Sequence, residues 1–280
     1  MGKTKFTLKC FLGRGFSFWQ VIGKRFQKKE YNNLNSILCR CVCGNKRYVN
    51  ACDLIHQKSK SCGCKVKWKR KYKCDLRYFE KIDTEDKAYF LGLLYADGCN
   101  HENANFVELK LQDRDKHILF AFRKYLKSNY KIKFLNPSSG FYDKNNKPYV
   151  CKKQYYLTIG SKKVCKDLKA LGCFPNKTLT LKFPNSKQVP SRFIVHFIRG
   201  FFDGDGYVHS GKSKGSVSFG FIGTLNMMRV IRRILMDNLK FKRVKLSNTN
   251  SKNCFVLTYA GRGQLRKFYD FIYKNATVFL

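Results

Sequence analysis

Two short segments of this sequence repeat each other, and each ends in an aspartate. Residues 90–98 read FLGLLYADG and residues 198–206 read IRGFFDGDG, so both are apolar runs closed by Asp-Gly. Asp97 and Asp205 therefore hold the same place in two similar segments. Carboxylates bind divalent metal ions, and a symmetric pair suits hydrolysis of the two antiparallel strands of DNA. The spacing predicts a paired-carboxylate centre for phosphodiester hydrolysis.

Two helices are expected to position these aspartates. Gly92 and Ala96 lie one helical turn apart on a single face. Gly200 and Gly204 repeat that spacing in the second segment. Small residues on one face allow two helices to pack backbone against backbone. An ordinary buried helix would explain the apolar residues, but it would not explain why each run ends in an acid.

The position of each aspartate at the end of a helix has an electrostatic consequence. A carboxylate there sits against the negative end of the helix dipole and needs a cation. Paired helices would bring Asp97 and Asp205 together at one end of their contact, where like charges are tolerable with a divalent metal present. We expect Gly98 and Gly206 to end the helices as left-handed residues.

The repeat extends to the surrounding elements, which predict a mixed α/β (α+β) fold made of two similar halves. The first copy predicts a helix from 84–86 through the apolar run, a strand over 105–112, a helix over 113–126, a polar loop around 137–148, a strand over 154–159 and a helix over 162–171 closed by Gly172. The second copy predicts a helix from 191, a strand over 216–222, a helix over 225–238, a strand over 255–259 and a helix over 263–273. Such a repeat implies pseudo-twofold symmetry within one chain.

Composition narrows the class of partner. The 280 residues include 57 Lys and Arg against 18 Asp and Glu, a formal net charge of +39. Self-repulsion of this size favours a polyanionic partner, with nucleic acid as the first choice and a membrane surface as the competitor. The longest apolar runs reach about half of the roughly 20 residues that a membrane-spanning helix needs. With no secretory signal recognised, we expect an intracellular protein without a membrane partner.

The cysteines near the N-terminus predict a structural zinc site. The two C-x-C pairs, each beside a glycine, supply four thiolates, a set that suits tetrahedral Zn²⁺. These residues are Cys41, Cys43, Cys62 and Cys64. Nearby substitutes are Cys39, Cys52 and His56. Metal binding would also explain how a segment with little apolar mass folds. The alternative is a cluster of reduced buried thiols.

A basic segment follows the cysteines. Six of the nine residues over 65–73 are Lys or Arg, interleaved with Trp68 and Tyr72. Such a run is suited to contact with DNA phosphates, although a nuclear-localisation signal has the same composition. The residues predicted to bind DNA here are Lys65, Lys67, Lys69, Arg70 and Lys71. The expected division is a zinc-binding module over 1–64, a basic linker over 65–81, and two halves over 82–187 and 188–280.

Over about residues 80–275 the chain resembles the double-motif LAGLIDADG homing endonucleases, on the strength of residues 90–98 and 198–206 with supporting segments at 79–97, 177–184 and 196–206. The resemblance implies two αββαββα halves whose motif helices form the interface and whose saddle-shaped antiparallel sheets lie in the DNA major groove. It also implies Mg²⁺-dependent double-strand breaks by a monomer at a long specific target site. Intron homing by a mobile element would be the biological setting.

The same resemblance implies roles for individual residues. Asp97 and Asp205 would be the catalytic acids, and with Ala96 and Gly204 would form the Mg²⁺ site. Lys162 and Arg262 would stabilise charge in the transition state, or simply contact phosphates. Gln112 would organise water, with Ile222 at its counterpart in the second half. The first acidic position of the motif is Tyr95 in one copy and Asp203 in the other, a difference expected to affect packing rather than chemistry.

Two further expectations concern recognition and alternatives. Lys110 and Gln112 lie on one face of their strand and could reach base edges in the major groove. Residues 10–65 resemble the zinc-binding segment attached to many phage and mobile-element nucleases, which implies DNA contact or spacing rather than catalysis. The alternative functions are a LAGLIDADG intron maturase that assists RNA splicing and a catalytically inactive DNA-binding regulator. Both aspartates are present, which favours the nuclease.

Overall fold

The chain forms two compact units, residues 1–71 and residues 72–280. The computed structural model describes residues 12–26, 36–64, 72–142, 148–211 and 216–280. Among the described residues, no helix combines the length and apolar character that crossing a membrane requires.

The first unit is a small antiparallel sheet with one short helix. Its strands are β1 (Gly15–Phe16), β2 (Trp19–Phe26), β3 (Ser36–Cys41) and β4 (Lys46–Asn50), paired in that order, and α1 (Ala51–Ile55) follows. A small core forms around the buried side chains of Trp19, Val21, Ile37 and Leu54. Because this core is small, a metal site nearby would add substantially to its stability.

The first half of the second unit follows the expected order of elements. It contains α2 (Glu85–Ala96), β5 (Gly98–His101), β6 (Phe106–Gln112), α3 (Lys116–Tyr125), β7 (Lys133–Leu135), β10 (Gln154–Gly160) and α4 (Lys162–Ala170). The sheet is antiparallel with strand order β5-β6-β10-β7. Short 3₁₀ turns cover Glu102–Ala104, Asp113–Asp115 and Lys177–Leu179. The prediction of a polar loop around 137–148 was wrong, because β8 (Ser138–Tyr142) and β9 (Pro148–Cys151) pair there as a hairpin.

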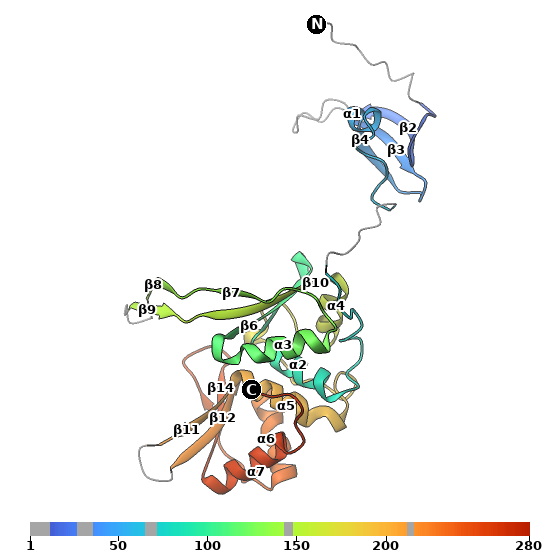
Figure 1. Cartoon of the computed structure of the whole chain (residues 1–280). Helices are drawn as coiled ribbons and strands as arrows, with labels where there is room; N and C mark the ends of the chain where they lie inside the picture. Colours follow the sequence, from blue (N-terminus) through green and yellow to red (C-terminus); the bar gives the residue numbers. More distant parts are fainter. Residues whose placement is uncertain (1–11, 27–35, 65–71, 143–147, 212–215) are drawn as a thin grey trace. The chain divides into compact units, whose positions relative to one another are not determined.

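The second half repeats this arrangement. After a 3₁₀ turn at Ser191–Phe193 it contains α5 (Ile194–Asp205), β11 (Gly206–Ser210), β12 (Val217–Gly223), α6 (Leu225–Leu239), β13 (Ser247–Asn248), β14 (Phe255–Ala260) and α7 (Arg262–Tyr273). Its antiparallel sheet has strand order β11-β12-β14-β13, which matches the first sheet strand for strand. Two αββαββα halves are therefore present, and the predicted fold class is confirmed (Figure 1).

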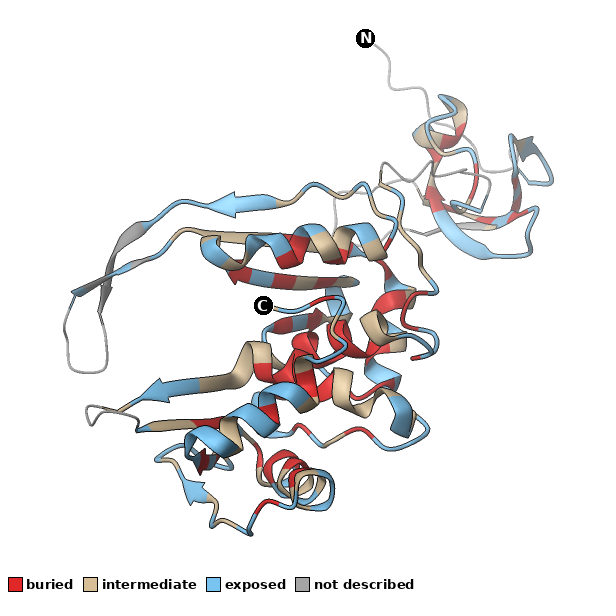
Figure 2. Ribbon diagram, turned by 60° about the horizontal axis from the view of Figure 1, so that its bottom comes forward, coloured by how far each residue is buried: buried red, intermediate tan, exposed pale blue. Residues whose placement is uncertain are grey.

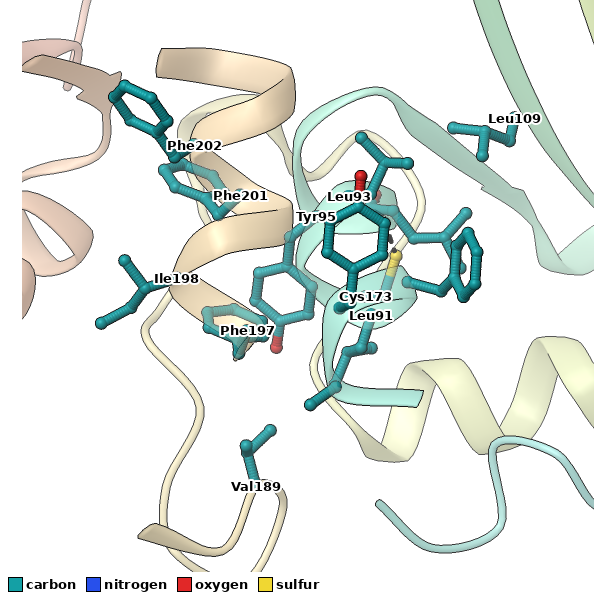
Figure 3. Packing of buried hydrophobic residues seen from close by; sticks show 14 of the residues in the cluster. Leu91, Leu93, Tyr95, Leu109, Cys173, Val189, Phe197, Ile198, Phe201 and Phe202 are labelled. Carbon is teal, nitrogen blue, oxygen red and sulfur yellow. Dashed lines mark hydrogen bonds between the residues drawn. The ribbon is translucent and has the colours of Figure 1, made fainter. Parts of the chain in front are cut away.

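The helices α2 and α5 pack against each other at the centre of the second unit (Figure 1). A Cβ atom at Gly92 would overlap the carbonyl oxygen of Phe197, and one at Gly200 would overlap that of Tyr89. The buried residues are concentrated along these two helices (Figure 2). Side chains such as Tyr95 and Phe197 fill the space around the contact (Figure 3). The predicted backbone-to-backbone packing is confirmed.

Substituting Gly200 by alanine should destabilise the second unit by about 3 kcal/mol, because the added methyl group forces the two helices apart. Chemical denaturation measures the free energy of unfolding. Gly263→Ala, in α7, is the matched control, since a Cβ there meets no atom within 4 Å. That control should gain about 0.5–1 kcal/mol from the higher helix propensity of alanine. Equal effects at the two sites would contradict the tight contact.

The expected left-handed glycines at the ends of the motif helices were wrong. Gly206 has φ −90° and ψ 166°, an extended conformation, and Gly98 is absent from the residues with positive φ. Each glycine instead begins the strand that follows the helix. The backbone at the start of that strand lies close to the last turn of the helix. A Cβ at Gly98 would lie 2.7 Å from the Leu94 carbonyl oxygen. Close backbone approach, not backbone handedness, requires glycine here. Gly172, at φ +94°, does close α4 as predicted.

Candidate active site

The α2–α5 contact brings the two predicted aspartates together. Asp97 is the C-terminal cap of α2, and Asp205 is the last residue of α5. A Cβ built at Gly204 would overlap the Ala96 side chain and lie 3.1 Å from Asp97 Oδ2. The absence of a side chain at Gly204 therefore makes room for the Asp97 carboxylate beside the end of the partner helix. Both acids meet at the same end of the helix pair.

Burial favours protonation of both carboxyl groups, and the charge of Asp97 adds to this effect at Asp205. Burial, together with the charge of Asp97, raises the pKa of Asp205 to about 6. Partial burial of the carboxyl group among surrounding protein atoms also raises the pKa of Asp97, and the charge of Asp115 raises it further. Over the whole residue, Asp97 is nevertheless exposed. The charge of Lys177 opposes both shifts. Neither aspartate forms an ion pair within 4.0 Å in the described part of the chain. When ionised, the pair is an anionic centre that Lys177 offsets only in part.

In metal-free solution we expect Asp205→Asn to stabilise the protein at neutral pH. A carboxyl group whose pKa is raised on folding binds more protons in the folded state, so the wild type loses stability as pH rises from about 4 to about 6. The asparagine variant lacks this loss. Its advantage should be small at pH 4 and about 2 kcal/mol at pH 7. Denaturation with a chelator present, across this pH range, measures the difference.

Asp83→Asn provides a control of opposite sign. The hydrogen bond from Lys87 lowers the pKa of Asp83, so its contribution to stability is present above the unfolded pKa and is lost as pH falls. That variant should be equal to or slightly less stable than the wild type at pH 7. An Asp205→Asn variant that followed the Asp83 pattern would show that burial and the charge of Asp97 do not raise the pKa of Asp205.

Lys177 is the cation that the helix dipoles need, and the sequence reasoning did not identify it. Its Nζ donates hydrogen bonds to the carbonyl oxygens of Gly98, at 2.6 Å, and Ala96, at 3.3 Å. The residue is only 7% exposed. It caps the C-terminal end of α2 beside Asp97. The one available signal was the requirement for a cation at this helix end, but the sequence does not show which of many lysines supplies it.

Lys162 and Arg262 lie elsewhere. Each is the first residue of a helix that follows the last strand of its sheet, and each is exposed. Lys162 follows Gly160, which pairs with Phe106 at the end of the sheet away from Asp97. The length of β5 alone separates these ends by about 10 Å. Arg262 and Ser210 line the same hollow. Ser210 is the last residue of β11, at the opposite end of that strand from Asp205. The fold does not bring either cation to the aspartates.

Gln112 and Lys110 lie on the exposed face of β6, as the alternation predicted. Both side chains are exposed, whereas Val107, Leu109 and Leu111 on the other face are buried. Gln112 lies beyond Leu109, the partner of Gly98, and therefore at the end of the strand nearer Asp97. Lys110 Nζ lies 3.6 Å from Glu108 on the same face.

The strand registers correct one expected correspondence between the halves. Gly98 pairs with Leu109 in the first sheet, and Gly206 pairs with Phe221 in the second. The next residue along each strand is Lys110 in the first half and Ile222 in the second. Ile222 therefore corresponds to Lys110 rather than to Gln112. The counterpart of Gln112 is Thr224, which is buried. Its hydroxyl donates to the Leu181 carbonyl and accepts from the α6 backbone. The two halves therefore present different side chains beside their aspartates.

The unequal first positions of the motif are both used in packing. The Asp203 carboxylate accepts hydrogen bonds from the hydroxyls of Tyr89, at 2.8 Å, and Tyr273, and from the backbone N–H of Leu280, at 2.7 Å. Tyr95 is buried and donates to a backbone carbonyl at 2.5 Å. Neither side chain is free to act in the centre formed by the later aspartates.

The first unit contains a group of four cysteines that could hold a metal ion. The sulfur atoms of Cys41, Cys43, Cys62 and Cys64 lie within 4.8 Å of one another. The sulfur atoms of Cys41 and Cys64 lie 3.4 Å apart, and those of Cys43 and Cys62 lie 3.3 Å apart. Gly44 and Gly63 have φ of +87° and +102°, the tight turns expected beside the ligands. A hydrogen bond with Cys43 lowers the pKa of the Cys62 thiol, which favours the metal-binding thiolate.

The proposed substitute ligands lie outside this group. Cys39 is buried and its thiol donates to the carbonyl of Ile37, whereas Cys52 and His56 are exposed. Among the described residues, none of the three joins the four-sulfur cluster. The predicted DNA-binding residues Lys65, Lys67, Lys69, Arg70 and Lys71 lie outside the described residues.

Comparison with known proteins places a LAGLIDADG-like domain in the second half. Residues 192–273 match the family model described as a LAGLIDADG-like domain, which spans the elements from α5 to α7. No curated protein sequence matches the chain. The first half, outside the matched segment, has the same order of elements as the second.

Several solved structures are similar to the chain. That of the LAGLIDADG meganuclease I-AabMI bound to uncleaved DNA shares 14% identity, with 68% of this chain and 84% of that chain covered and a TM-score of 0.37. The I-LtrWI LAGLIDADG homing endonuclease bound to target DNA shares 12% identity, with coverage of 72% and 85% and a TM-score of 0.40. The N-terminal LAGLIDADG domain of DUF199/WhiA shares 13% identity, with coverage of 73% and 92% and a TM-score of 0.40.

Proposed function

We propose that the protein is a metal-dependent homing endonuclease that hydrolyses both strands of DNA at a long specific site. The observation that carries this proposal is the meeting of Asp97 and Asp205 at one end of the α2–α5 contact. Two carboxylates on related helices suit two scissile phosphates on antiparallel strands. The family match over residues 192–273 supports the same class of protein, and the net charge of +39 suits a polyanionic substrate.

The donor set at this centre fits Mg²⁺. Hard oxygen ligands are what this ion prefers, and the two aspartates would hold it with help from the carbonyl groups of Ala96 and Gly204. The pKa of Asp205 is raised, and among the described residues neither aspartate has an ion pair, so a cation would relieve the repulsion there. Bound Mg²⁺ supplies an acidic water ligand and offsets charge on the leaving oxygen.

The surrounding residues of the chain have distinct roles in this proposal. Lys177 holds a positive charge beside both carboxylates, where it would stabilise negative charge in the transition state. Because Lys177 donates to Ala96, it also restricts which side of that carbonyl a metal approaches. Gln112 would orient water in the first half. Lys162 and Arg262, at the outer ends of the sheets, suit contacts with phosphates rather than chemistry.

DNA would lie across the exposed faces of the two sheets. Lys110 and Gln112 are exposed on β6 and would reach base edges in the major groove, because alternating strand residues share one outward face. We propose that the protein acts as a monomer, because one chain supplies both halves. The four-cysteine cluster of the first unit would bind Zn²⁺ as a structural ion, with the unit serving DNA contact or spacing.

Cleavage of a DNA library that contains candidate insertion sites tests the proposal. The full chain, supplied with Mg²⁺, should convert a subset of sites to double-strand breaks, and chelation of the metal should stop the reaction. Sequencing of the ends identifies the target and the overhang. Tight DNA binding without cleavage of any site would reject the nuclease and leave the DNA-binding regulator or the splicing maturase in its place.

A further inference from the structure

A second concentration of positive charge lies on the second half, away from the paired aspartates. Residues 225–246 contain seven Lys and Arg and one acid, Asp237. This segment comprises α6 and the connection that leads toward β13. A charge imbalance of this size over so short a stretch needs a counter-anion.

The helix α6 separates its apolar and basic residues onto different faces. Its fully buried side chains are Met227, Met228, Ile231 and Leu235. Another face of α6 carries a stripe of residues at helical spacing, namely Arg229, Arg232, Arg233 and Met236. Arg229 and Arg233 are exposed, and Arg232 is half-buried. The core therefore fixes the orientation of the arginine stripe.

The chain segment after α6 lies beside this stripe, and the two together form a groove. Arg232 Nη1 donates to the carbonyl oxygen of Val244 at 2.8 Å and holds the connection beside the helix. Two hollows of about 490 and 510 Å³ result, and Arg229, Arg232 and Arg243 line both. Lys245 lines the first hollow and Asp237 the second. Among the described residues, no carboxylate lies within 4.0 Å of a charged nitrogen of these arginines.

This groove is separate from the surface on which DNA would meet the second sheet. The α6 helix lies against β12 (Figure 1). The buried face of β12 carries Phe219 and Phe221, which belong to the same core as the buried residues of α6. Ser218, Gly220 and Ile222 alternate with these residues and face the other way. A duplex lying on that outer face is therefore separated from the arginines by the sheet and the helix.

The ligand chemistry follows from the arginines and their spacing. Guanidinium groups pair with phosphate oxygens through two parallel hydrogen bonds. The arginines of the stripe, from Arg229 to Arg233, span about 6 Å along the helix. Phosphates recur about every 3.4 Å along the axis for each strand of a duplex, so about two of them match this length. The charged residues that line the two hollows are cationic apart from Asp237, which suits contact with phosphate oxygens.

We propose that the groove between α6 and residues 242–246 binds the phosphate backbone of a second segment of double-stranded DNA, outside the sheet surface used for the target. One protein molecule would then hold two duplex segments. This contact does not require cleavage, and it goes beyond the nuclease activity proposed above.

A two-duplex capture assay with the full chain tests this site. One duplex is fixed to beads and a second, fluorescent duplex is added without divalent metal, so that the result is independent of cleavage. The wild type should retain the second duplex. Arg229→Gln with Arg233→Gln should reduce retention at least about tenfold and lower the slope of log affinity against log salt by about 2. Both residues are exposed, and unchanged thermal unfolding would confirm that the variant folds.

The matched control removes the same charge from α3 and its end in the first half. Lys124→Gln with Lys127→Gln changes two exposed cations and should retain the second duplex as the wild type does. Equal loss in both variants would overturn the proposal, because it would indicate a general effect of net charge. Retention by the arginine variant, stronger capture of double-stranded RNA, or equal competition by polyglutamate would each overturn it as well.

Discussion

Asp97→Asn and Asp205→Asn are each expected to lower the rate of DNA cleavage at least about a hundredfold. Asparagine keeps the shape of aspartate but removes the negative charge that binds a divalent metal. DNA affinity measured without metal should stay within about threefold or rise, because each variant removes a negative charge near the phosphates. Rates of conversion of a supercoiled target plasmid to nicked and linear forms measure the effect on each strand.

These variants separate catalysis from folding. Asp205→Asn should be more stable than the wild type at neutral pH without metal, so its loss of activity cannot be attributed to unfolding. The matched control is Asp75→Asn, which changes an aspartate on the approach to α2 and should leave cleavage unchanged. Full activity in either paired-aspartate variant would contradict the assignment of the metal centre. Lys177→Met should reduce the rate without abolishing metal binding.

Removal of zinc is expected to unfold the first unit while the second unit remains folded. Structural zinc sites of this kind contribute about 10–16 kcal/mol of apparent binding free energy at neutral pH. The apolar core around Trp19 and Leu54 is too small to replace that contribution. Chelation, or Cys43→Ser with Cys62→Ser, should abolish the structured signal of this unit and the bound zinc. Metal analysis and amide hydrogen exchange measure both effects.

Cys52→Ser is the matched control, since Cys52 is exposed and lies outside the four-sulfur cluster. This variant should keep one zinc per chain and native protection of the first unit. The same loss of protection in Cys52→Ser and in the cluster variant would contradict the four-cysteine assignment. A first unit that kept its protection without metal would show that its apolar core is sufficient.

Features fixed by local spacing were predictable from the sequence. Gly92 and Gly200 could be assigned to a helix contact because residues one turn apart on a helix always share a face. Hydrophobic periodicity gave the helices and the longer strands of each half, such as β6 and β14, but it missed the short strands β5, β7, β11 and β13, whose presence only the family resemblance implied. The four cysteines could be grouped because paired C-x-C spacing brings ligands together within short loops.

Features that depend on the path of the chain were not predictable. The hairpin of β8 and β9 lies in a segment whose polar residues resemble a loop. Ile222 was matched to Gln112 by sequence order, whereas the register set by Gly206 matches it to Lys110. This difference of two residues keeps the same face of the strand but changes which side chain lies beside the aspartate. Sequence order alone does not fix that register.

The sequence by itself determined that Asp97 and Asp205 end two similar helices with small residues on one face. Only the tertiary structure decided what surrounds them. Lys177 reaches the end of α2 through backbone carbonyls, and any residue type presents such carbonyls, so no pattern in residues 90–98 specifies it. Lys162 and Arg262 begin helices at the outer ends of their sheets because the preceding strands run away from the centre. Local spacing is a property of the sequence, whereas the partner of a backbone group depends on where the chain returns.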